Sequence, residues 1–335
     1  MRGTVSLLLL LSVAACSRKR HDPDKFVSRI TAGHAHACAE LSTGRLACWG
    51  DDRAVHGADR AVSLPSPVEA PAEMKKPTIV ASGDSTMVFD ETSSKLFGRF
   101  TIETPLRART STFHGNSSTA CALDVGGILQ CTRETAAWLI TVPTFAFKAF
   151  ALSDTRACGI TNVSEEVHCF DAEQVKGDTR IPGLEGSIAV GVGQSFACAL
   201  SKGRTLSCWG KNDVGQLGNG STIEQARPVR VVGLEGVHSF ALGRSHACAI
   251  LHDWTLWCWG DNTHGELADG THEPNGVPRP IPGLFDVAEI ALGDDFTCVR
   301  TNDRDHAARC WGKNDRGQAG DGTMLDRAVP SFVKF

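Results

Sequence analysis

The sequence contains no tyrosine, and aromatic residues make up only 7% of its 335 residues. Beyond the N-terminus it also lacks any stretch with a sustained helical spacing of apolar residues. Glycine and proline are common instead, with 34 and 14 residues. This composition predicts many short strands joined by turns rather than a helical fold.

Several motifs that would indicate catalysis or ligand binding are also missing. The chain has no Gly-x-Ser-x-Gly elbow, no His-Glu-x-x-His pair and no phosphate loop that ends in Lys-Ser/Thr. No segment has the spaced oxygen ligands of a helical calcium loop. The formal net charge is −4 and the basic residues are scattered, so no footprint for nucleic acid is evident. We therefore expect no enzymatic activity, no cofactor, no metal site and no nucleic-acid partner.

Cysteine, by contrast, is abundant and regularly placed. Twelve of the 13 cysteines form pairs that are 10 to 12 residues apart. Zinc sites favour cysteines two to four residues apart, so the spacing argues against zinc, the competing use of these residues. The pairs are Cys38/Cys48, Cys121/Cys131, Cys158/Cys169, Cys198/Cys208, Cys248/Cys258 and Cys298/Cys310.

Each pair lies in a segment that is typical of a β-hairpin. Directly opposed residues on antiparallel strands have Cα atoms roughly 4.5–5.5 Å apart, and a disulfide accepts about 4.4–6.8 Å. The even separation of ten leaves an odd-numbered loop, such as three residues with a left-handed glycine. Gly44 and Gly203 fit that position. The sequence thus predicts one disulfide across each hairpin, which requires an oxidising compartment.

The hairpin segments are part of a repeat, with copies that start near residues 28, 78, 113, 147, 184, 235 and 285. The second copy is degenerate: alignment of Gly83 with Gly33 places Val88 and Gly98 at the two cysteine positions. The joint loss of both cysteines is what pairing within each copy predicts. A uniform repeat along residues 26–335 favours one closed body over two domains.

The N-terminus is typical of an exported protein. Residues 1–15 have a basic start and a short apolar core, as signal peptides do, and the core is far too short to span a bilayer. Val13-Ala14-Ala15-Cys16 resembles the lipobox of bacterial lipoproteins, which implies that Cys16 is the lipidated first residue of the mature chain. Residues 16–25 would then be a charged tether. An ordinary secretory signal with a stray cysteine is the alternative.

Three copies share a longer motif: CWGKNDVGQLGNG (208–220), CWGDNTHGELADG (258–270) and CWGKNDRGQAGDG (310–322). They resemble the repeat of the regulator of chromosome condensation family. That resemblance implies an all-β fold, a seven-bladed β-propeller of four-stranded antiparallel blades. Because 329–335 and 26–33 are both extended, we expect the ring to be closed by mixing N- and C-terminal strands in one blade.

Two groups of side chains are candidates for function. His34 and His36 would share one face of a strand over 30–38, where packing between blades is favoured over metal binding. Trp254 stands at a hairpin tip where another copy has Arg204, with His252 and Asp253 beside it. An exposed aromatic there is a candidate contact anchor, and a Trp folded over the neighbouring turn is the alternative. Trp257 is expected to be core.

Together these features predict a non-enzymatic lipoprotein of the bacterial envelope, held at the outer membrane by the lipid on Cys16. We expect a monomer whose propeller faces bind an unknown protein partner. The family that the repeat resembles includes a secreted inhibitor of beta-lactamases, so protein binding by an exported member has precedent. A carbohydrate-binding or hydrolytic propeller is the alternative. Guanine nucleotide exchange, the activity of the family's founder, is disfavoured by export and by the acidic charge balance.

Overall fold

The computed structural model describes residues 26–335 except for 52, 54–59, 71, 73, 76, 90–93, 99–107, 116–118, 125, 134–135, 143–145, 172–177 and 304–305. The predicted signal peptide, Cys16 and the tether lie outside the described residues. In the described part, regular structure is almost entirely β-strand, arranged as seven antiparallel sheets. None of its helical segments has the length and hydropathy needed to cross a bilayer.

We number the sheets one to seven in chain order. Sheets one to four comprise β1 (Val27–Ala32), β2 (His36–Leu41), β3 (Leu46–Asp51) and β4 (Ala61–Val68); β5 (Thr78–Ser82), β6 (Ser85–Phe89) and β7 (Ser94–Gly98); β8 (Ala108–Gly115), β9 (Thr119–Asp124), β10 (Leu129–Arg133) and β11 (Ala136–Val142); and β12 (Phe147–Leu152), β13 (Arg156–Thr161), β14 (Val167–Asp171) and β15 (Thr179–Ile181). Sheets five to seven comprise β16 (Ser187–Val192), β17 (Phe196–Ser201), β18 (Leu206–Gly210) and β19 (Gln225–Arg230); β20 (Val237–Leu242), β21 (His246–Leu251), β22 (Leu256–Gly260) and β23 (Asn275–Pro280); and β24 (Val287–Leu292), β25 (Phe296–Thr301), β26 (Ala308–Gly312) and β27 (Arg327–Phe332).

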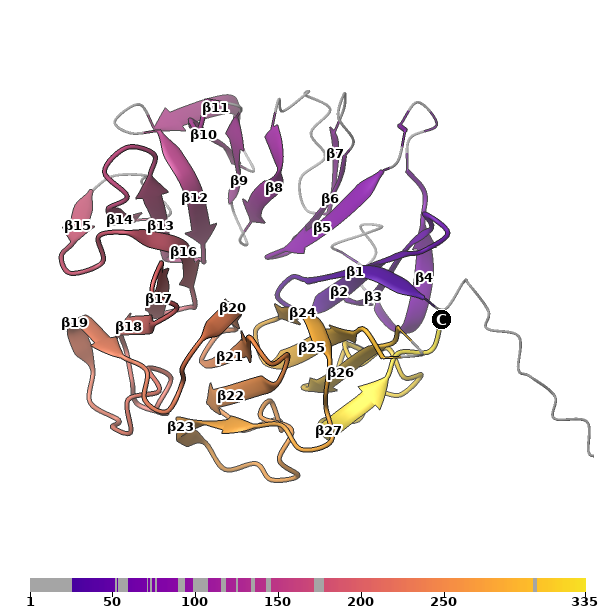
Figure 1. The fold of residues 1–335 in the computed structure, drawn as a ribbon. Helices are drawn as coiled ribbons and strands as arrows, with labels where there is room; N and C mark the ends of the chain where they lie inside the picture. The colour runs from indigo at the N-terminus through magenta and orange to yellow at the C-terminus, as the bar shows by residue number, and fades with distance from the viewer. Residues whose placement is uncertain are drawn as a thin grey trace, which may run out of the picture.

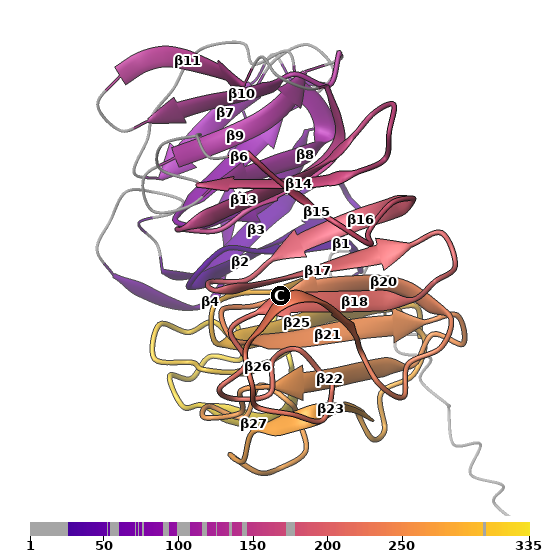
Figure 2. The ribbon, with the colours of Figure 1, turned by 90° about the vertical axis from the view of Figure 1, so that its left-hand side faces the viewer.

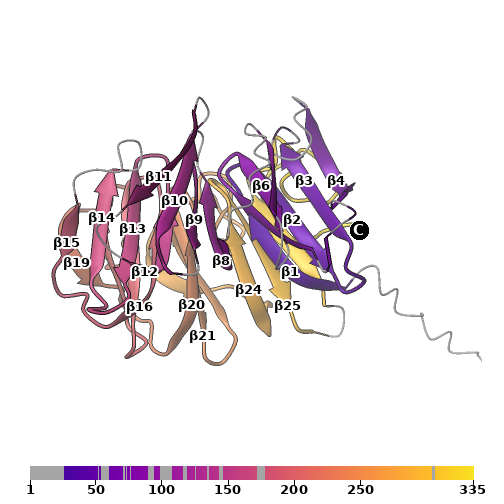
Figure 3. The ribbon, with the colours of Figure 1, turned by 90° about the horizontal axis from the view of Figure 1, so that it is seen from above.

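The sheets stand around a common centre, with the first strand of each sheet innermost (Figure 1). Views from the side and from above show the sheets stacked face to face around this centre (Figures 2 and 3). Neighbouring sheets contact each other through their inner strands, and β24 of the last sheet contacts β1 of the first. The all-β prediction is therefore confirmed, and most sheets have the predicted four antiparallel strands. Sheet two has three strands among the described residues.

The expectation that terminal strands mix in one blade is wrong. Sheet one is built from β1 to β4 alone and sheet seven from β24 to β27 alone. The two sheets instead pack face to face around a shared core that includes Val27, Trp49, Phe296 and Val333. Since sheet seven already obtains its fourth strand from its own copy, it has no position for a strand from the N-terminus.

The six predicted disulfides are confirmed, each within one sheet. In every pair the two cysteines lie directly opposite each other on the second and third strands. Their Cα atoms are 4.0 or 4.1 Å apart, slightly closer than the distances expected from the sequence. Bonds at these positions restrict each hairpin separately. The bonds join Cys38 to Cys48, Cys121 to Cys131, Cys158 to Cys169, Cys198 to Cys208, Cys248 to Cys258, and Cys298 to Cys310.

The pair of Cys158 with Cys169 departs from the predicted three-residue loop. Its cysteines are 11 residues apart rather than 10, and the hairpin is closed by a bond from Thr161 N to Glu166 O at 3.0 Å. The loop therefore comprises residues 162–165, and its last residue, Glu165, is left-handed with φ 53°. The extra residue lies in the turn, so the two cysteines stay opposed.

In sheet two the predicted equivalence with the cysteine positions is only half right. Val88 lies on β6 and is fully buried, as the cysteine of the other copies is. Its partner on β7, however, is Lys95, whereas Gly98 pairs with Ser85. The alignment by glycines therefore placed the second cysteine position three residues too far along the chain.

The tryptophan of the Cys-Trp-Gly motif joins neighbouring sheets. Trp259 Nε1 donates to the carbonyl oxygen of Gln216 at 3.0 Å, and Trp311 Nε1 donates to that of Glu266 at 2.7 Å. Trp49 of sheet one donates in the same way to Gln318 of sheet seven, at 2.8 Å. We call this contact the indole latch. The interface between the last and first sheets thus uses the same hydrogen bond as the interfaces between sheets five, six and seven.

The loops that carry these carbonyls, residues 211–224, 261–274 and 313–326, owe their shape to a buried asparagine. Asn212 Nδ2 donates to the carbonyls of Ser221 and Ile223, and its Oδ1 accepts from the Leu217 amide. Gly218 of the first loop has φ +65°, and a Cβ there would lie 2.7 Å from Trp259 Nε1. The glycine-rich motif is therefore a turn that fits against the indole latch.

Candidate functional site

The ring presents two faces that differ in their turns. One face, which we call the Trp254 face, carries the turns between second and third strands together with the connections between sheets. Backbone bonds join these segments, as from His252 N to Gly236 O at 3.0 Å and from Val287 N to Trp254 O at 3.1 Å. The opposite face, which we call the mouth face, carries the turns between first and second strands and the long 211–224, 261–274 and 313–326 loops.

Trp254 lies at a hairpin tip, as predicted. The three-residue loop between β21 and β22 is closed by a bond from Leu251 N to Thr255 O at 3.0 Å. Trp254 occupies the left-handed position of this loop with φ 63°, and its side chain remains 41% exposed. A bulky residue in that conformation costs about 1–2 kcal/mol relative to glycine. Sequence alone did not predict this strain.

The equivalent position is Gly44 in sheet one and Arg204 in sheet five, with φ 81° and 60°. The prediction is therefore correct for Gly44 and wrong for Gly203, which is one residue too early. In sheet five the predicted three-residue loop is present, but Arg204 rather than a glycine occupies its left-handed position.

The neighbours of Trp254 support its ring from one side. The centroid of its ring lies 4.8 Å from the ring centroid of His238 on β20. The ring centroids of His238 and His252 are 5.8 Å apart. Asp253 Oδ1 accepts hydrogen bonds from the amide and hydroxyl of Thr255 at 3.1 and 2.6 Å. These bonds lower the pKa of Asp253. His252, Asp253 and Trp254 are thus adjacent, with Asp253 fixing the turn.

A second exposed aromatic residue lies on the same face. Phe285 is 68% exposed in the connection from β23 to β24, two residues before Val287, whose amide bonds to Trp254. Trp257, by contrast, lies on β22 and packs against the core between sheets five and six, as predicted. The Trp254 face therefore combines two exposed aromatic side chains with polar turns.

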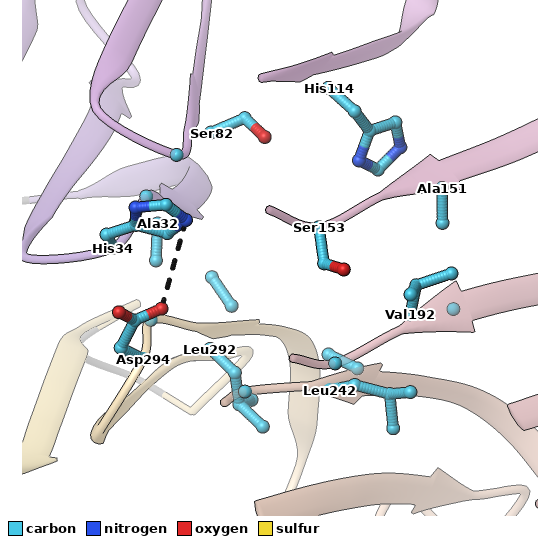
Figure 4. Close-up of a pocket in the computed structure, with 18 of the residues that line it drawn as sticks. Ala32, His34, Ser82, His114, Ala151, Ser153, Val192, Leu242, Leu292 and Asp294 are labelled. Carbon is cyan, nitrogen blue, oxygen red and sulfur yellow. Dashed lines mark ion pairs between the residues drawn. The ribbon is translucent and has the colours of Figure 1, made fainter. Parts of the chain in front are cut away.

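A cavity of about 390 Å³ lies at the centre of the ring. It is lined by the ends of the inner strands of all seven sheets and by the turns that follow them on the mouth face. Val192, Leu242 and Leu292, the last residues of β16, β20 and β24, form an apolar side (Figure 4). This volume falls in the range of small-molecule sites in proteins.

His34 stands at the mouth of this cavity among three carboxylates. Its Nδ1 lies 3.2 Å from Asp84, and its Nε2 lies 4.0 Å from Asp154 and 3.9 Å from Asp294. Burial would lower the pKa of His34, but the bond to Asp84 and the charges of Asp294 and Asp154 raise it to about 9. The imidazole is therefore a cation at neutral pH. Figure 4 shows its pairing with Asp294.

Hydrogen bonds between turns fix these side chains around the mouth. Asp294 N donates to His34 O at 3.0 Å, and Arg244 N donates to Asp294 O at 2.9 Å. The Arg244 guanidinium in turn donates from Nε to Gln194 Oε1 at 2.7 Å. The rim is thus rigidly placed by backbone contacts from one sheet to the next.

The prediction that His34 and His36 share a strand face is wrong. β1 ends at Ala32 and β2 begins at His36, so His34 lies in the intervening turn. His36 is buried and its Nε2 lies 2.8 Å from Thr86 Oγ1, which confirms packing between sheets for this residue. His246 is placed alike, 3.0 Å from Thr297 Oγ1, and burial lowers its pKa to about 4.

His114 on β8 is a cavity residue that sequence reasoning missed. Its imidazole projects into the cavity (Figure 4) and packs edge-on against Phe150 with centroids 4.9 Å apart. Burial lowers the pKa of His114 to about 4, so the ring is neutral. In the strand pairing His114 opposes Cys121, as Ala241 opposes Cys248. The signal in the sequence is thus a histidine where another copy has a small residue.

The described residues contain no cluster of three or more histidine, cysteine, aspartate or glutamate side chains suited to a metal ion. The side-chain contacts at the mouth are hydrogen bonds and ion pairs. The neutral His114 and the cationic His34 differ in charge state because only His34 has carboxylates beside it.

Comparison with known proteins relates the repeated sheets of this chain to a repeat family and to a known fold. Residues 206–250 and 255–300 match one model of the Regulator of chromosome condensation (RCC1) repeat, and residues 188–216, 237–266 and 287–318 match a second. The fold is that of a β-propeller, with sheets that resemble RCC1 blades. Sheets five to seven carry RCC1 repeats. Comparison with curated proteins finds no significant match.

Solved structures share the fold at low sequence identity. Prp20p from Saccharomyces cerevisiae is 15% identical with a TM-score of 0.60, over 91% of this chain and 76% of that one. Human WBSCR16 is 18% identical with a TM-score of 0.55, over 94% and 83%. The ectodomain of the Arabidopsis thaliana receptor kinase ACR4 is 14% identical with a TM-score of 0.56, over 92% and 99%.

Proposed function

We propose that this protein is a closed seven-bladed propeller that acts outside the cytosol as a non-enzymatic binding protein, with the Trp254 face as its docking surface for another protein. Six disulfides indicate an oxidising, extracytoplasmic location, because such bonds persist where thiols are not kept reduced. The face-to-face contact of sheets one and seven supports closure of the ring.

The observation that carries the binding proposal is the placement of Trp254. The chain keeps a large aromatic residue exposed at a left-handed position where glycine or arginine serves elsewhere. Tryptophan is the residue most enriched at the energetic centres of protein interfaces, and polar turns around it supply a rim. Phe285 extends the apolar area on the same face. A rigid anchor of this kind binds a partner with little loss of side-chain entropy.

Crosslinking in intact cells followed by mass spectrometry tests this proposal. A specific partner should be recovered with the wild-type chain and lost with Trp254→Ala. Leu325→Ala is the matched control, because Leu325 is 69% exposed but lies in a loop of the mouth face. If no specific partner is recovered, or if both variants lose it equally, the Trp254 face is not the docking surface.

We further propose that Cys16 is lipidated and anchors the propeller at the outer membrane of a bacterial envelope. The lipobox-like Val13-Ala14-Ala15-Cys16 supports this, and twelve cysteines in disulfides leave Cys16 as the odd residue. Labelling of cells with an alkyne fatty acid should modify the wild-type chain and not Cys16→Ser. Equal labelling of both would contradict lipidation at this residue and would leave the binding proposal intact.

A further inference from the structure

The N-terminal segment joins the ring on the Trp254 face. The carbonyl oxygen of Phe26 accepts a hydrogen bond from Ser42 N, in the turn between β2 and β3, at 2.7 Å. The Phe26 ring packs edge-on against His306, in the turn between β25 and β26, with centroids 5.4 Å apart, and Val27 N donates to His306 O at 3.1 Å. Both turns belong to the Trp254 face, so the tether of residues 16–25 attaches there and not at the mouth face.

The tether is too short to turn the mouth face toward a membrane. Its ten residues, 16–25, span at most about 33–36 Å when fully extended. From Phe26 it would first have to cross sheet one from the innermost strand, β1, to the outermost, β4, over strands about 4.8 Å apart. It would then have to follow the height of the sheet, about 20 Å for the six residues of β1. These distances use about the whole span of the tether, so a chain anchored at Cys16 keeps its Trp254 face on the membrane side.

Two neighbouring positions on this face carry aromatic residues where the preceding copy carries charged ones. The Trp254 carbonyl accepts a bond from the connection that carries Phe285, and the Arg204 carbonyl accepts the equivalent bond from the connection that carries Glu235. The pair Arg204 and Glu235 is thus replaced, one copy later, by Trp254 and Phe285. Two charges are lost and two exposed rings are gained at one place, which favours contact with an apolar patch on a partner.

The charges beside the two rings distinguish a protein surface from a lipid surface. Asp253 precedes Trp254 and Asp286 follows Phe285, and both carboxylates are exposed. The segments that hold the rings, 252–255 and 283–286, contain these two carboxylates and no lysine or arginine. Anionic lipid headgroups attract basic side chains and repel carboxylates, so these segments are unsuited to lipid. An apolar pocket edged by basic side chains complements them.

We infer that the partner of the Trp254 face is an integral membrane protein, whose part outside the bilayer presents an apolar pocket edged by basic residues to Trp254 and Phe285. The inference rests on the proposed docking role of this face and on the proposed lipidation of Cys16. The anchor confines both proteins to one membrane, which raises their effective concentration for each other, so a small contact area suffices. The mouth face is turned away from the membrane.

Photocrosslinking in intact cells tests the inference. The crosslinking residue p-benzoylphenylalanine replaces Phe285 in one full-length variant and Leu325, on the mouth face, in a matched control. The two positions are almost equally exposed, at 68% and 69%. Mass spectrometry identifies the crosslinked partner, and alkaline carbonate extraction of the membranes shows whether the uncrosslinked partner is integral. We expect an integral membrane protein at position 285 and not at position 325.

A third variant separates the anchor from the docking surface. It carries the crosslinking residue at position 285 and an ordinary cleaved secretory signal in place of residues 1–16. Its crosslinks to the membrane protein should fall about tenfold or more, because it is no longer held beside its partner. Immunoblots verify equal amounts of all variants, and the fatty-acid labelling described above shows separately whether Cys16 is lipidated.

The possible outcomes distinguish this inference from the docking proposal. A soluble protein captured at position 285 overturns the inference and leaves the docking surface intact. Crosslinks to lipid alone at position 285, or no crosslink, overturn both. The inference also fails if position 325 captures the same membrane protein equally well, or if removal of the anchor has no effect on its capture.

Discussion

At the scale of single residues, one buried position of the repeat carries an ionisable side chain where two related copies carry a neutral one. Glu266 is 1% exposed in the 261–274 loop, where the two related loops have Gln216 and Gln318. Those glutamines donate from Nε2 to Asp213 and Asp315, both at 3.1 Å. In the Glu266 loop the equivalent aspartate is Thr263. The pair of substitutions avoids placing two carboxylates side by side.

Glu266→Gln should stabilise the protein above neutral pH. Burial raises the pKa of Glu266 from 4.5 to about 7, so the folded state holds this proton more tightly than the unfolded state. Stability therefore falls as pH rises from about 4.5 through 7, and the full cost persists above 7. The variant should remove this slope and gain up to about 3 kcal/mol at pH 8. Urea unfolding of both proteins at pH 5 and pH 8 measures the effect; an equal difference at the two pH values would contradict it.

The contribution of His34 to the stability of the fold should depend on pH over a different range. Its pKa is raised from 6.5 to about 9, so its contribution is complete below pH 6.5 and is lost as pH rises through 9. His34→Gln should therefore destabilise the protein by roughly 1–3 kcal/mol near pH 6 and by much less at pH 9.5. Thermal unfolding across this range measures it. Equal destabilisation at both ends would show that His34 acts through packing and not through its charge.

At the scale of elements, the strands and disulfides were predictable because the repeat encodes them locally. The even spacing of Cys198 and Cys208 predicts one hairpin without reference to the rest of the chain. The left-handed residue was misplaced at Gly203 because Arg204, a residue that disfavours this conformation, occupies it. The mixing of terminal strands was wrongly expected for another reason: the way the first and last sheets meet depends on contacts between copies, such as Trp49 with Gln318, which local spacing does not reveal.

The candidate site was predictable only in part, for the same reason. Trp254 differs from the residue at the same position in other copies, such as Arg204, so comparison of the copies could find it. The cavity depends instead on residues that converge from different sheets. His34 and Asp294 are far apart in sequence, and only the packing of sheet seven against sheet one brings their side chains within 3.9 Å of each other.

The indole latch predicts that the interface between sheets seven and one resembles the interfaces between sheets five, six and seven. Trp49→Phe and Trp259→Phe each remove one buried hydrogen bond and leave a carbonyl without its donor. Each should destabilise the protein by about 1–3 kcal/mol, and the two values should agree within about 1 kcal/mol. Chemical denaturation with matched far-ultraviolet signals gives both numbers. If Trp49→Phe were silent while Trp259→Phe was not, the first and last sheets would not be latched.

At the scale of the whole molecule, stability should depend on the redox state. Each hairpin disulfide restricts the unfolded chain and can contribute about 2–4 kcal/mol, although six such contributions will not add simply. Reduction with dithiothreitol should therefore lower the midpoint of thermal unfolding markedly. Calorimetry with and without reductant measures this, and an unchanged midpoint would mean that packing between sheets alone maintains the fold.

The central claim is that each repeat copy with two cysteines builds its own sheet with its own disulfide, in an oxidising compartment. A peptide map of the protein purified from cells, prepared without reductant and read by mass spectrometry, tests it most directly. We predict six bridges, each between cysteines 10 to 12 residues apart: Cys38–Cys48, Cys121–Cys131, Cys158–Cys169, Cys198–Cys208, Cys248–Cys258 and Cys298–Cys310. Free thiols at these positions, or bridges between different sheets, would contradict it.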